Sequence, residues 1–557
     1  MLRSHPILRH RAVTTLITVG SVANVLALAG CNNTGTAGGT QTAQGNGGAS
    51  GNVLRYPIET EPTTLDPALV QDGPTIDLLQ NMYEGLVGWN EKNEVVPLIA
   101  KEMPKISADG KVYTFTIRDN AKFPGGDPIT AEDVKYSITR SLDPKLASAV
   151  AMNYLDDIVG AKEVADGKAT DLAGIKVVDP KTVQISLTSP RGYFLGKLTY
   201  PTAYVLSRKE VEKGAATEQG AHSIDTTNVG TVGEGPFKLA SYVRGSKITL
   251  AANTDYWAGK PKLDSIERPI ILDVQTQRNL YDSGRLDYIG LQKGDFEKDR
   301  SNPALQDQIK KWKRAATWYV GINQLHYAPF KDKRVRQAFA YAIDKDAIVK
   351  SVLLGVPVKA EGILPDGIPG FNPAFKGIPY NPDKAKALLI EAGYPGGKGL
   401  PALQLSFRQK QSDIGHTAEV LQQQLATVGI PITLNGMEWG TFLSLNKVGK
   451  TDMVHMRWSA DYLDPQDFLS LLLTTTGSEN HTGYSNPQVD ALCKQADGES
   501  DQTKRLALYA QAEKLVVDDA PWVPLYYQAD LELMRPNVKG IRDGLMGHLP
   551  HTTTSVN

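Results

Sequence analysis

The sequence predicts an α/β protein with more than one domain. The chain has 557 residues, which is enough for two to four domains at roughly 100–200 residues each. After about residue 310, two helix–glycine–strand units follow each other. In the first, a helix opened by Asn381-Pro382 leads to a strand at 403–407, and in the second a helix at 413–428 leads to a strand at 430–434. Consecutive units of this kind favour parallel strand pairing.

The first 52 residues read as an export signal followed by a tether. Residues 1–12 carry three arginines and no acid, and residues 13–30 are uncharged and mostly small or apolar. The segment ends in Leu28-Ala29-Gly30-Cys31, which resembles the bacterial lipobox, whose cysteine is diacylated and becomes the first mature residue. Residues 31–52 are uncharged and rich in Gly, Thr and Asn, so we expect a flexible tether that spans roughly 25 Å.

These features predict a signal peptide at 1–30, a tether at 31–52 and a lipid on Cys31. The lipid would hold the chain on the extracytoplasmic face of a cell membrane. A transmembrane anchor and an ordinary signal peptide are the alternatives. No later stretch is long and apolar enough to span a bilayer.

The rest of the chain predicts further helices and strands. Thr130 precedes an apolar helical stripe and has Asp133 three residues later, which is the spacing of a capping box. Residues 112–117 alternate as a half-buried strand does. Other expected helices lie at 76–86, from Asp332, from Asp344 and at 499–517, and other expected strands lie at 175–178, 182–187, 203–206, 248–252 and 523–527.

One stretch in the second half combines a strand, a carboxylate and a turn. Residues 454–460 form a strand-like run, Asp461 follows, and Asp464-Pro465 predicts the turn. A strand end beside a turn can hold a charged group at the wall of a cavity. Because Asp461 lies between Trp458 and Tyr462, it can be desolvated and still reachable, and such a carboxylate attracts an ammonium group strongly. A surface acid at a turn is the alternative.

Composition argues against several other functions. With 60 basic and 61 acidic residues, the formal net charge of −1 argues against a general nucleic-acid binder. Since Cys31 lies in the export signal, Cys493 has no disulfide partner and is expected to be a buried, inert thiol. The sequence has no zinc-protease, nucleophile-elbow or Walker motif, so we expect neither an enzyme nor a bound cofactor or metal.

Four segments of the chain together resemble one protein family. They are TAEDVKYSITR at 130–140, GEGPF at 233–237, NTDYWAGKP at 253–261 and PFKDKRVR at 329–336. In this order they are similar to the extracytoplasmic solute-binding proteins of family 5, which serve oligopeptide and dipeptide ABC importers. The resemblance extends from about residue 53 to 550.

The resemblance implies a two-lobe α/β fold of the periplasmic-binding-protein type (type II, cluster C), with a hinge and an extra subdomain. Such proteins close over a ligand by a hinge motion. The expected lobe I is discontinuous and comprises 53–84, 203–282 and 526–550, whereas the extra subdomain is 85–202 and lobe II is 283–525. The implied partners are permease subunits of an ABC importer, and the implied state is a monomer.

The resemblance also implies an oligopeptide ligand and residues that bind it. In oligopeptide-binding members, a motif similar to residues 458–462 supplies the aspartate that pairs with the peptide's α-ammonium, and Asp461 takes that place here. The strand around Trp458 and the segment Gln71-Asp72-Gly73 are expected to pair with the peptide backbone as added strands do.

The sequence departs from the family at the other end of this expected site. His455 stands where we expect a basic residue that meets the peptide's carboxylate, and Arg457 stands where a small residue is usual and is the candidate to replace it. Trp439 and Tyr527 are expected to line loose side-chain pockets, although aromatic residues also fill cores.

Two alternatives remain open. Other members of the superfamily bind nickel chelates, oligosaccharides or opines on the same scaffold, so the fold alone does not decide the ligand. A secreted hydrolase tethered to the envelope is the alternative from another class, and it would need a nucleophile or metal constellation.

Overall fold

The computed structural model describes residues 51–557 except residues 218 and 227. The predicted signal peptide, Cys31 and most of the predicted tether lie outside these residues. Asn52, which we assigned to the tether, is already part of the fold, because its side-chain amide donates to the Lys262 carbonyl at 2.9 Å and its side-chain oxygen accepts from the Val556 amide at 2.6 Å. None of the helices in the described part of the chain is long and apolar enough to cross a membrane.

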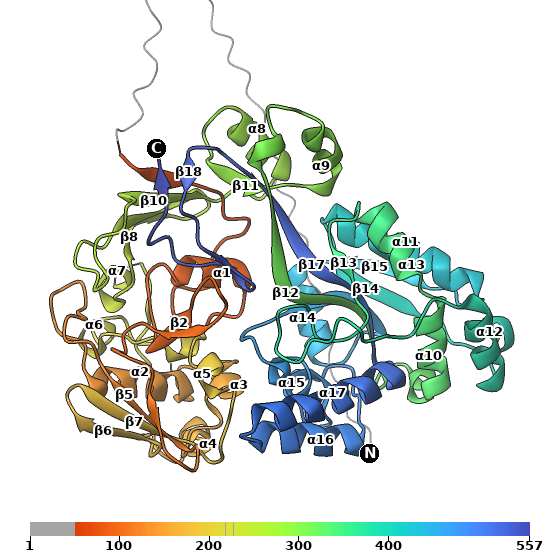
Figure 1. Cartoon of the computed structure of the whole chain (residues 1–557), viewed down its shortest axis with the longest axis horizontal. Coiled ribbons are helices and arrows are strands. Elements are labelled where there is room, and N and C mark those ends of the chain that lie inside the picture. Colours follow the sequence, from red (N-terminus) through yellow and green to blue (C-terminus); the bar gives the residue numbers. More distant parts are fainter. Residues whose placement is uncertain (1–50, 218, 227) are drawn as a thin grey trace, which may run out of the picture. The chain divides into compact units, whose positions relative to one another are not determined.

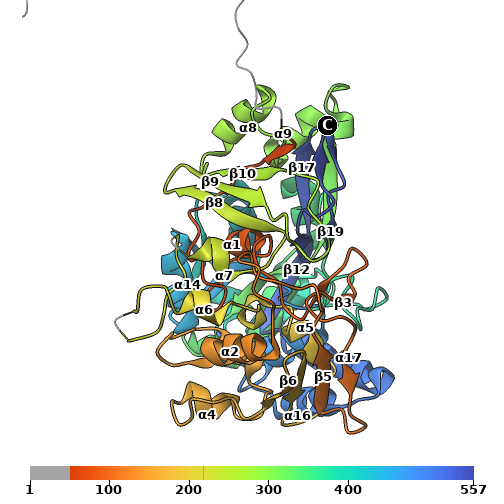
Figure 2. The ribbon, with the colours of Figure 1, turned by 90° about the vertical axis from the view of Figure 1, so that its left-hand side faces the viewer.

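A four-stranded sheet brings the start of the described chain next to residues 237–269. Its order is β1 (Val53–Arg55), β10 (Ser265–Pro269), β9 (Lys247–Ala252) and β8 (Phe237–Val243), and only the β1–β10 pair is parallel. Leu54, Leu250 and Ile266 of this sheet are buried in one core with Leu79 of helix α1 (Gly73–Leu79). Figure 2 shows α1 below the strands β8, β9 and β10.

Helix α1 starts and ends earlier than the predicted helix at 76–86. Its N-terminus is set by Asp72, whose side chain accepts from the Thr75 amide, and by Pro74 in the first turn. The apolar residues after Leu79 are buried without being helical, and they lead into the hairpin of β2 (Val87–Trp89) and β3 (Val95–Pro97). The period of the apolar residues misled the prediction because tertiary packing, rather than a helix face, buries them.

A second four-stranded sheet lies within residues 105–186. Its order is β4 (Lys105–Ile106), β5 (Val112–Thr116), β7 (Thr182–Ser186) and β6 (Ile175–Asp179), all antiparallel. Helix α2 (Ala131–Leu142) packs on β6 and β7, and the predicted capping box is present, since Thr130 and Asp133 exchange side-chain and backbone hydrogen bonds. The strand expected at 203–206 is absent. Ala203 ends the 3-10 turn Pro201–Ala203, and the Val205 and Leu206 amides donate to the Glu84 carbonyl and the Ser137 hydroxyl instead of to a neighbouring strand.

The largest sheet has seven strands and belongs to the second half of the chain (Figure 1). Three of its strands are parallel, as the helix–strand units predicted. Its order is β11 (Tyr288–Gly290), β17 (Trp522–Met534), β12 (Ile309–Ile322), β16 (Met453–Ser459), β14 (Gln404–Arg408) and β15 (Thr433–Met437), with β13 (Val358–Lys359) paired to β17. β12 was not predicted, and β17 extends well beyond the expected 523–527.

Helices cover this sheet and pack on one another. Those with predicted starts or ends are α10 (Lys333–Ala342), α11 (Lys345–Ala347), α12 (Pro382–Glu391), α13 (Ser412–Thr427) and α17 (Gln502–Asp519). α16 (Pro487–Gly498) packs against α17 and carries Cys493, which is fully buried with its pKa raised to about 12 by burial. The expected burial of this thiol is thus confirmed, and its inertness stays a prediction.

The remaining described α-helices and strands are short. The helices are α3 (Ala151–Leu155), α4 (Ala161–Ala165), α5 (Phe194–Lys197), α6 (Arg208–Val211), α7 (Val229–Val232), α8 (Val274–Asp282), α9 (Lys293–Arg300), α14 (Trp439–Lys447) and α15 (Ser470–Leu473). The strands are β18 (Val538–Lys539), β19 (Asp543–Gly544), β20 (Gly547–His548) and β21 (Ser555–Val556).

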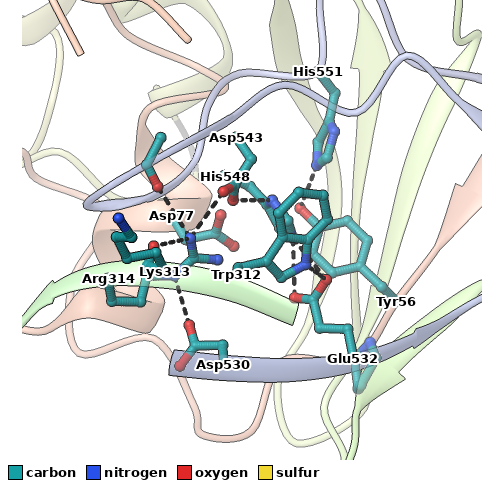
Figure 3. Close-up of polar contacts among 12 residues, drawn as sticks. Tyr56, Asp77, Trp312, Lys313, Arg314, Asp530, Glu532, Asp543, His548 and His551 are labelled. Atoms are coloured by element: carbon teal, nitrogen blue, oxygen red, sulfur yellow. Dashed lines mark hydrogen bonds and ion pairs between the residues drawn. The ribbon is translucent and has the colours of Figure 1, made fainter. Parts of the chain in front are cut away.

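A charged network fastens the C-terminal hairpin of β19 and β20 to the two longest strands (Figure 3). Arg314 of β12 donates to Asp530 of β17 at 2.6 Å and to Asp543 of β19 at 2.9 Å. His548 lies 2.9 Å from both Glu532 and Asp543. Burial lowers the pKa of His548, but these two carboxylates outweigh burial and raise it to about 10, so His548 is a cation at neutral pH.

Candidate functional site

Asp461 lies just beyond the end of β16, between that strand and the turn at Pro465–Asp467. The predicted strand, carboxylate and turn are therefore all present. Its side chain is half-buried, and its Oδ2 accepts a hydrogen bond of 2.7 Å from the Tyr154 hydroxyl. Burial raises the pKa of Asp461 to about 7, the charge of Glu479 acts in the same direction, and the Tyr154 hydrogen bond opposes them. Its Oδ1 has no hydrogen-bond partner in the described part of the chain.

A neighbouring carboxylate, Asp467, organises this stretch. It is fully buried, and its Oδ2 accepts hydrogen bonds from the Trp458 indole and from the Asp461 amide, both at 3.1 Å. Burial and then the charge of Asp461 raise the pKa of Asp467 well above its usual range. Through these two hydrogen bonds Asp467 orients Trp458 and the backbone of Asp461.

The turn after Asp461 is anchored by a buried ion pair. Arg505 of α17 donates to both oxygens of Asp464, at 2.5 and 2.8 Å. Such a bidentate pair fixes direction as well as distance. Next to it, Tyr462 is completely buried and packs against Tyr154 and Tyr193, so the chain on both sides of Asp461 is held.

Two tyrosines connect Asp461 to the segment Gln71-Asp72-Gly73. Tyr154 of α3 stacks on Tyr200 with ring centroids 3.6 Å apart, and the Tyr200 hydroxyl donates to the carbonyl of Val70, directly before Gln71. Gln71 and Gly73 are exposed, whereas the Asp72 side chain is occupied as the cap of α1. The structure thus brings the two predicted backbone-binding segments near the same tyrosine pair.

The backbone of β16 has an open edge beside Asp461. β12 pairs with the whole of β16, from Met453 to Ser459, but β14 pairs only with Met453 to His455. Residues 456–459 therefore have no second strand partner among the described residues. An extended chain could add to this edge by main-chain hydrogen bonds.

Arg457 projects from this open part of β16. Its side chain is exposed, and its Nη1 donates to the Gln528 side-chain oxygen at 2.5 Å. Burial nevertheless lowers the pKa of Arg457.

The other predicted site residues differ in accessibility. His455 is buried against Trp318, and burial lowers its pKa to about 3, so it is neutral. Trp439 is half-buried at the start of α14, with the Arg408 guanidinium 5.2 Å from its ring. Tyr527 is buried, and its hydroxyl accepts from the Gly362 amide at 3.1 Å, so its polar end is engaged by a neighbouring loop.

Sequence reasoning missed Tyr154, Tyr200 and Asp467. Asp467 follows Pro465 in the turn that was predicted, and only its spacing from Asp461 could have drawn attention to it. Tyr154 lies 307 residues from Asp461, and no local pattern announces that contact. Within residues 51–557, apart from the two omitted positions, no group of three or more His, Cys, Asp or Glu side chains could hold a metal ion.

The comparisons with known proteins point to one family. Residues 94–480 match the sequence model described as bacterial extracellular solute-binding proteins, family 5, middle region. The dipeptide-binding protein DppE of Bacillus subtilis is 33% identical over 512 residues, which cover 89% of this chain and 90% of DppE. The periplasmic murein peptide-binding protein MppA of Escherichia coli is 32% identical, over 87% of this chain and 89% of MppA.

Solved structures are similar over almost the whole described chain. The murein tripeptide-binding protein MppA of Escherichia coli has a TM-score of 0.79 at 30% identity and covers 91% of this chain and 99% of its own. A periplasmic oligopeptide-binding protein from Borrelia burgdorferi has a TM-score of 0.80 at 30% identity, with coverage of 90% and 99%. Similarity of this extent shows a shared two-lobe α/β fold.

Proposed function

The chain belongs to family 5 of the bacterial extracellular solute-binding proteins, and on that premise we propose that it is a lipid-anchored receptor that captures oligopeptides and delivers them to the permease subunits of an ABC importer. Members of this family bind solutes and are not enzymes, and they work outside the cytoplasm. Relatives of the chain are named for dipeptide, oligopeptide and murein peptide binding, which supports a peptide as the ligand here.

The observation that carries this proposal is the combination of Asp461 with the open edge of β16. Asp461 offers a desolvated carboxylate with Oδ1 free, which suits the α-ammonium of a peptide. The unpaired residues 456–459 offer main-chain groups to the peptide backbone. Backbone pairing ignores side-chain identity, so a receptor built in this way accepts many sequences.

The other predicted residues take supporting roles in this proposal. Trp458, held by Asp467, and the segment Gln71-Asp72-Gly73 flank the peptide, and Trp439 lines a side-chain pocket. Arg457 meets the peptide's carboxylate in place of His455, which is buried and neutral. A pocket role for Tyr527 stays a prediction.

Lipid on Cys31 and the tether complete the proposal, because they keep the receptor within reach of the permease. The chain acts as a monomer in it. The boundaries of the two lobes and the extra subdomain remain as proposed from the sequence.

Substitution of Asp461 by alanine tests the central contact. We expect the Asp461→Ala variant to bind free-amine peptides more weakly by about 2–4 kcal/mol, because an ammonium group loses its buried partner. N-acetylated peptides should lose much less. Equal losses for both peptides in isothermal titration calorimetry would show that Asp461 does not hold the amine.

Native mass spectrometry of the purified chain tests the ligand class. A copurified mass that matches a peptide supports the proposal. An oligosaccharide, metal chelate or opine, together with no binding of added peptides, would select a different solute on the same scaffold. Cleavage of an added peptide would instead indicate a hydrolase.

A further inference from the structure

Two arginines lie at the end of the open β16 edge that is farther from Asp461. Arg408 is the last residue of β14, where that strand stops pairing with β16, and Arg457 lies on β16 beyond that point. Arg408 lies against the Trp439 ring, and within the described residues it has neither a hydrogen bond nor an ion pair. Arg457 donates only to the Gln528 amide oxygen and lies 5.9 Å from the Trp318 ring.

Neither arginine has a carboxylate partner in the described part of the chain. Among the buried arginines, Arg140 pairs with Asp66 and Arg505 with Asp464, each at 2.5 Å. The buried Arg336 instead donates to the carbonyls of Phe330 and Asp519. Among the acids, Asp530 has the strongest charge effect on Arg457. Its carboxylate already accepts hydrogen bonds from Arg314 and from the Gln528 amide, each at 2.6 Å. The charge of Arg408 also disfavours the charged form of Arg457, so the two cations repel each other.

The position of this pair relates it to the peptide site. β14, β15 and β16 are parallel, so their ends lie at the same edge of the sheet. Arg408 is the last residue of β14, Trp439 follows β15, and Asp461 follows β16. Ligands of α/β sheets bind at the carboxyl ends of such strands. Arg457 is four residues before Asp461, about 13 Å along an extended chain, which is the length of about four peptide residues.

We propose that Arg408 and Arg457 together select short peptides whose last residue has an acidic side chain. This inference rests on the proposed function, since it takes the peptide amine to lie at Asp461. One arginine then pairs with the α-carboxylate, and the other pairs with the side-chain carboxylate of the same residue. A peptide with a neutral last residue leaves one of the two cations without a partner, so it forgoes one charge-assisted hydrogen-bonded pair.

Calorimetry with isosteric peptides tests this selectivity. The full-length chain, purified in detergent and stripped of copurified ligand, is titrated with Ala-Ala-Ala-Glu and Ala-Ala-Ala-Gln and with the matching tripeptides. We expect the peptide ending in Glu to bind about ten- to a hundredfold more tightly, the range of one charge-assisted hydrogen-bonded pair. The Arg408→Gln variant should bring the ratio of the two affinities close to one, and Arg408→Lys should keep part of it.

Two further variants separate this inference from the proposed function. Lys447→Gln removes an exposed charge at the end of α14, the helix that begins at Trp439, and should leave the Glu-to-Gln ratio unchanged. Asp461→Asn should weaken both peptides by the same factor. Equal affinities for the two peptides, or a ratio that Arg408→Gln does not change, would overturn the inference while an effect of Asp461→Asn still supported peptide binding. Failure of every peptide to bind would overturn both.

Discussion

The raised pKa of Asp461 predicts that peptide affinity depends on pH. Asp461 must be ionised to hold an ammonium group, and burial raises its pKa to about 7 in the free protein. Affinity is therefore full above pH 7 and falls by about tenfold for each pH unit below it, as the carboxylate takes up a proton. At pH 5 the loss reaches about 2.7 kcal/mol, from two units at about 1.36 kcal/mol each.

The ligand sets the other limb of the profile. An α-amino group has a pKa of about 7.7–8.0, so the peptide loses its charge above pH 8. We therefore expect a maximum of affinity between about pH 7 and 8. Calorimetric titrations of one free-amine peptide from pH 5 to 9 measure the profile, and its N-acetylated form, which has no ammonium group, provides the control.

Tyr154 gives this prediction a structural test. Its hydroxyl donates to Asp461 Oδ2 at 2.7 Å, and that hydrogen bond lowers the pKa of Asp461 against the effect of burial. The Tyr154→Phe variant removes the hydrogen bond and should move the acidic midpoint above pH 7. Tyr327→Phe is the matched control, because it removes a hydroxyl that donates to the Pro401 carbonyl instead. A flat profile between pH 5 and 8, or a midpoint that Tyr154→Phe moves downward, would refute the reasoning.

Three other predictions concern the fold and the anchor. Arg505→Ala should lower the free energy of unfolding by about 3–5 kcal/mol in urea denaturation, because it leaves Asp464 buried without its bidentate partner, and a loss below 1 kcal/mol would contradict that role. His548 has a folded pKa of about 10, above its unfolded value, so it stabilises the fold below about pH 6.5 and that stabilisation is lost as the pH rises through 10. Thermal unfolding of His548→Gln should show a smaller decrease between pH 7 and 10 than the original chain, and identical decreases would argue against the ion pairs with Glu532 and Asp543. Cys31→Ser should abolish labelling by a radioactive fatty acid and release the chain from the membrane fraction, and continued labelling would place the lipid elsewhere.

Much of the local structure followed from the sequence. Thr130 and Asp133 identified the start of α2, and Asn381-Pro382 that of α12, because caps depend on residues within one turn of each other. The stretch from β16 through Asp461 to Asp464-Pro465 was predicted for the same reason. The predictions of a helix at 76–86 and of a strand at 203–206 were wrong, because distant segments, rather than one face of a regular helix or strand, bury these apolar residues.

The sequence alone determined that Asp461 follows a strand and precedes a turn, and its resemblance to a family pointed to that carboxylate. Only the tertiary structure decided what surrounds it. Tyr154 and Arg505 reach the Asp461 stretch from other parts of the chain, and the open edge of β16 exists because β14 stops pairing at His455. Helix caps and turns are set by neighbouring residues, whereas desolvation, strand pairing and unpaired charge depend on which distant groups the fold brings together.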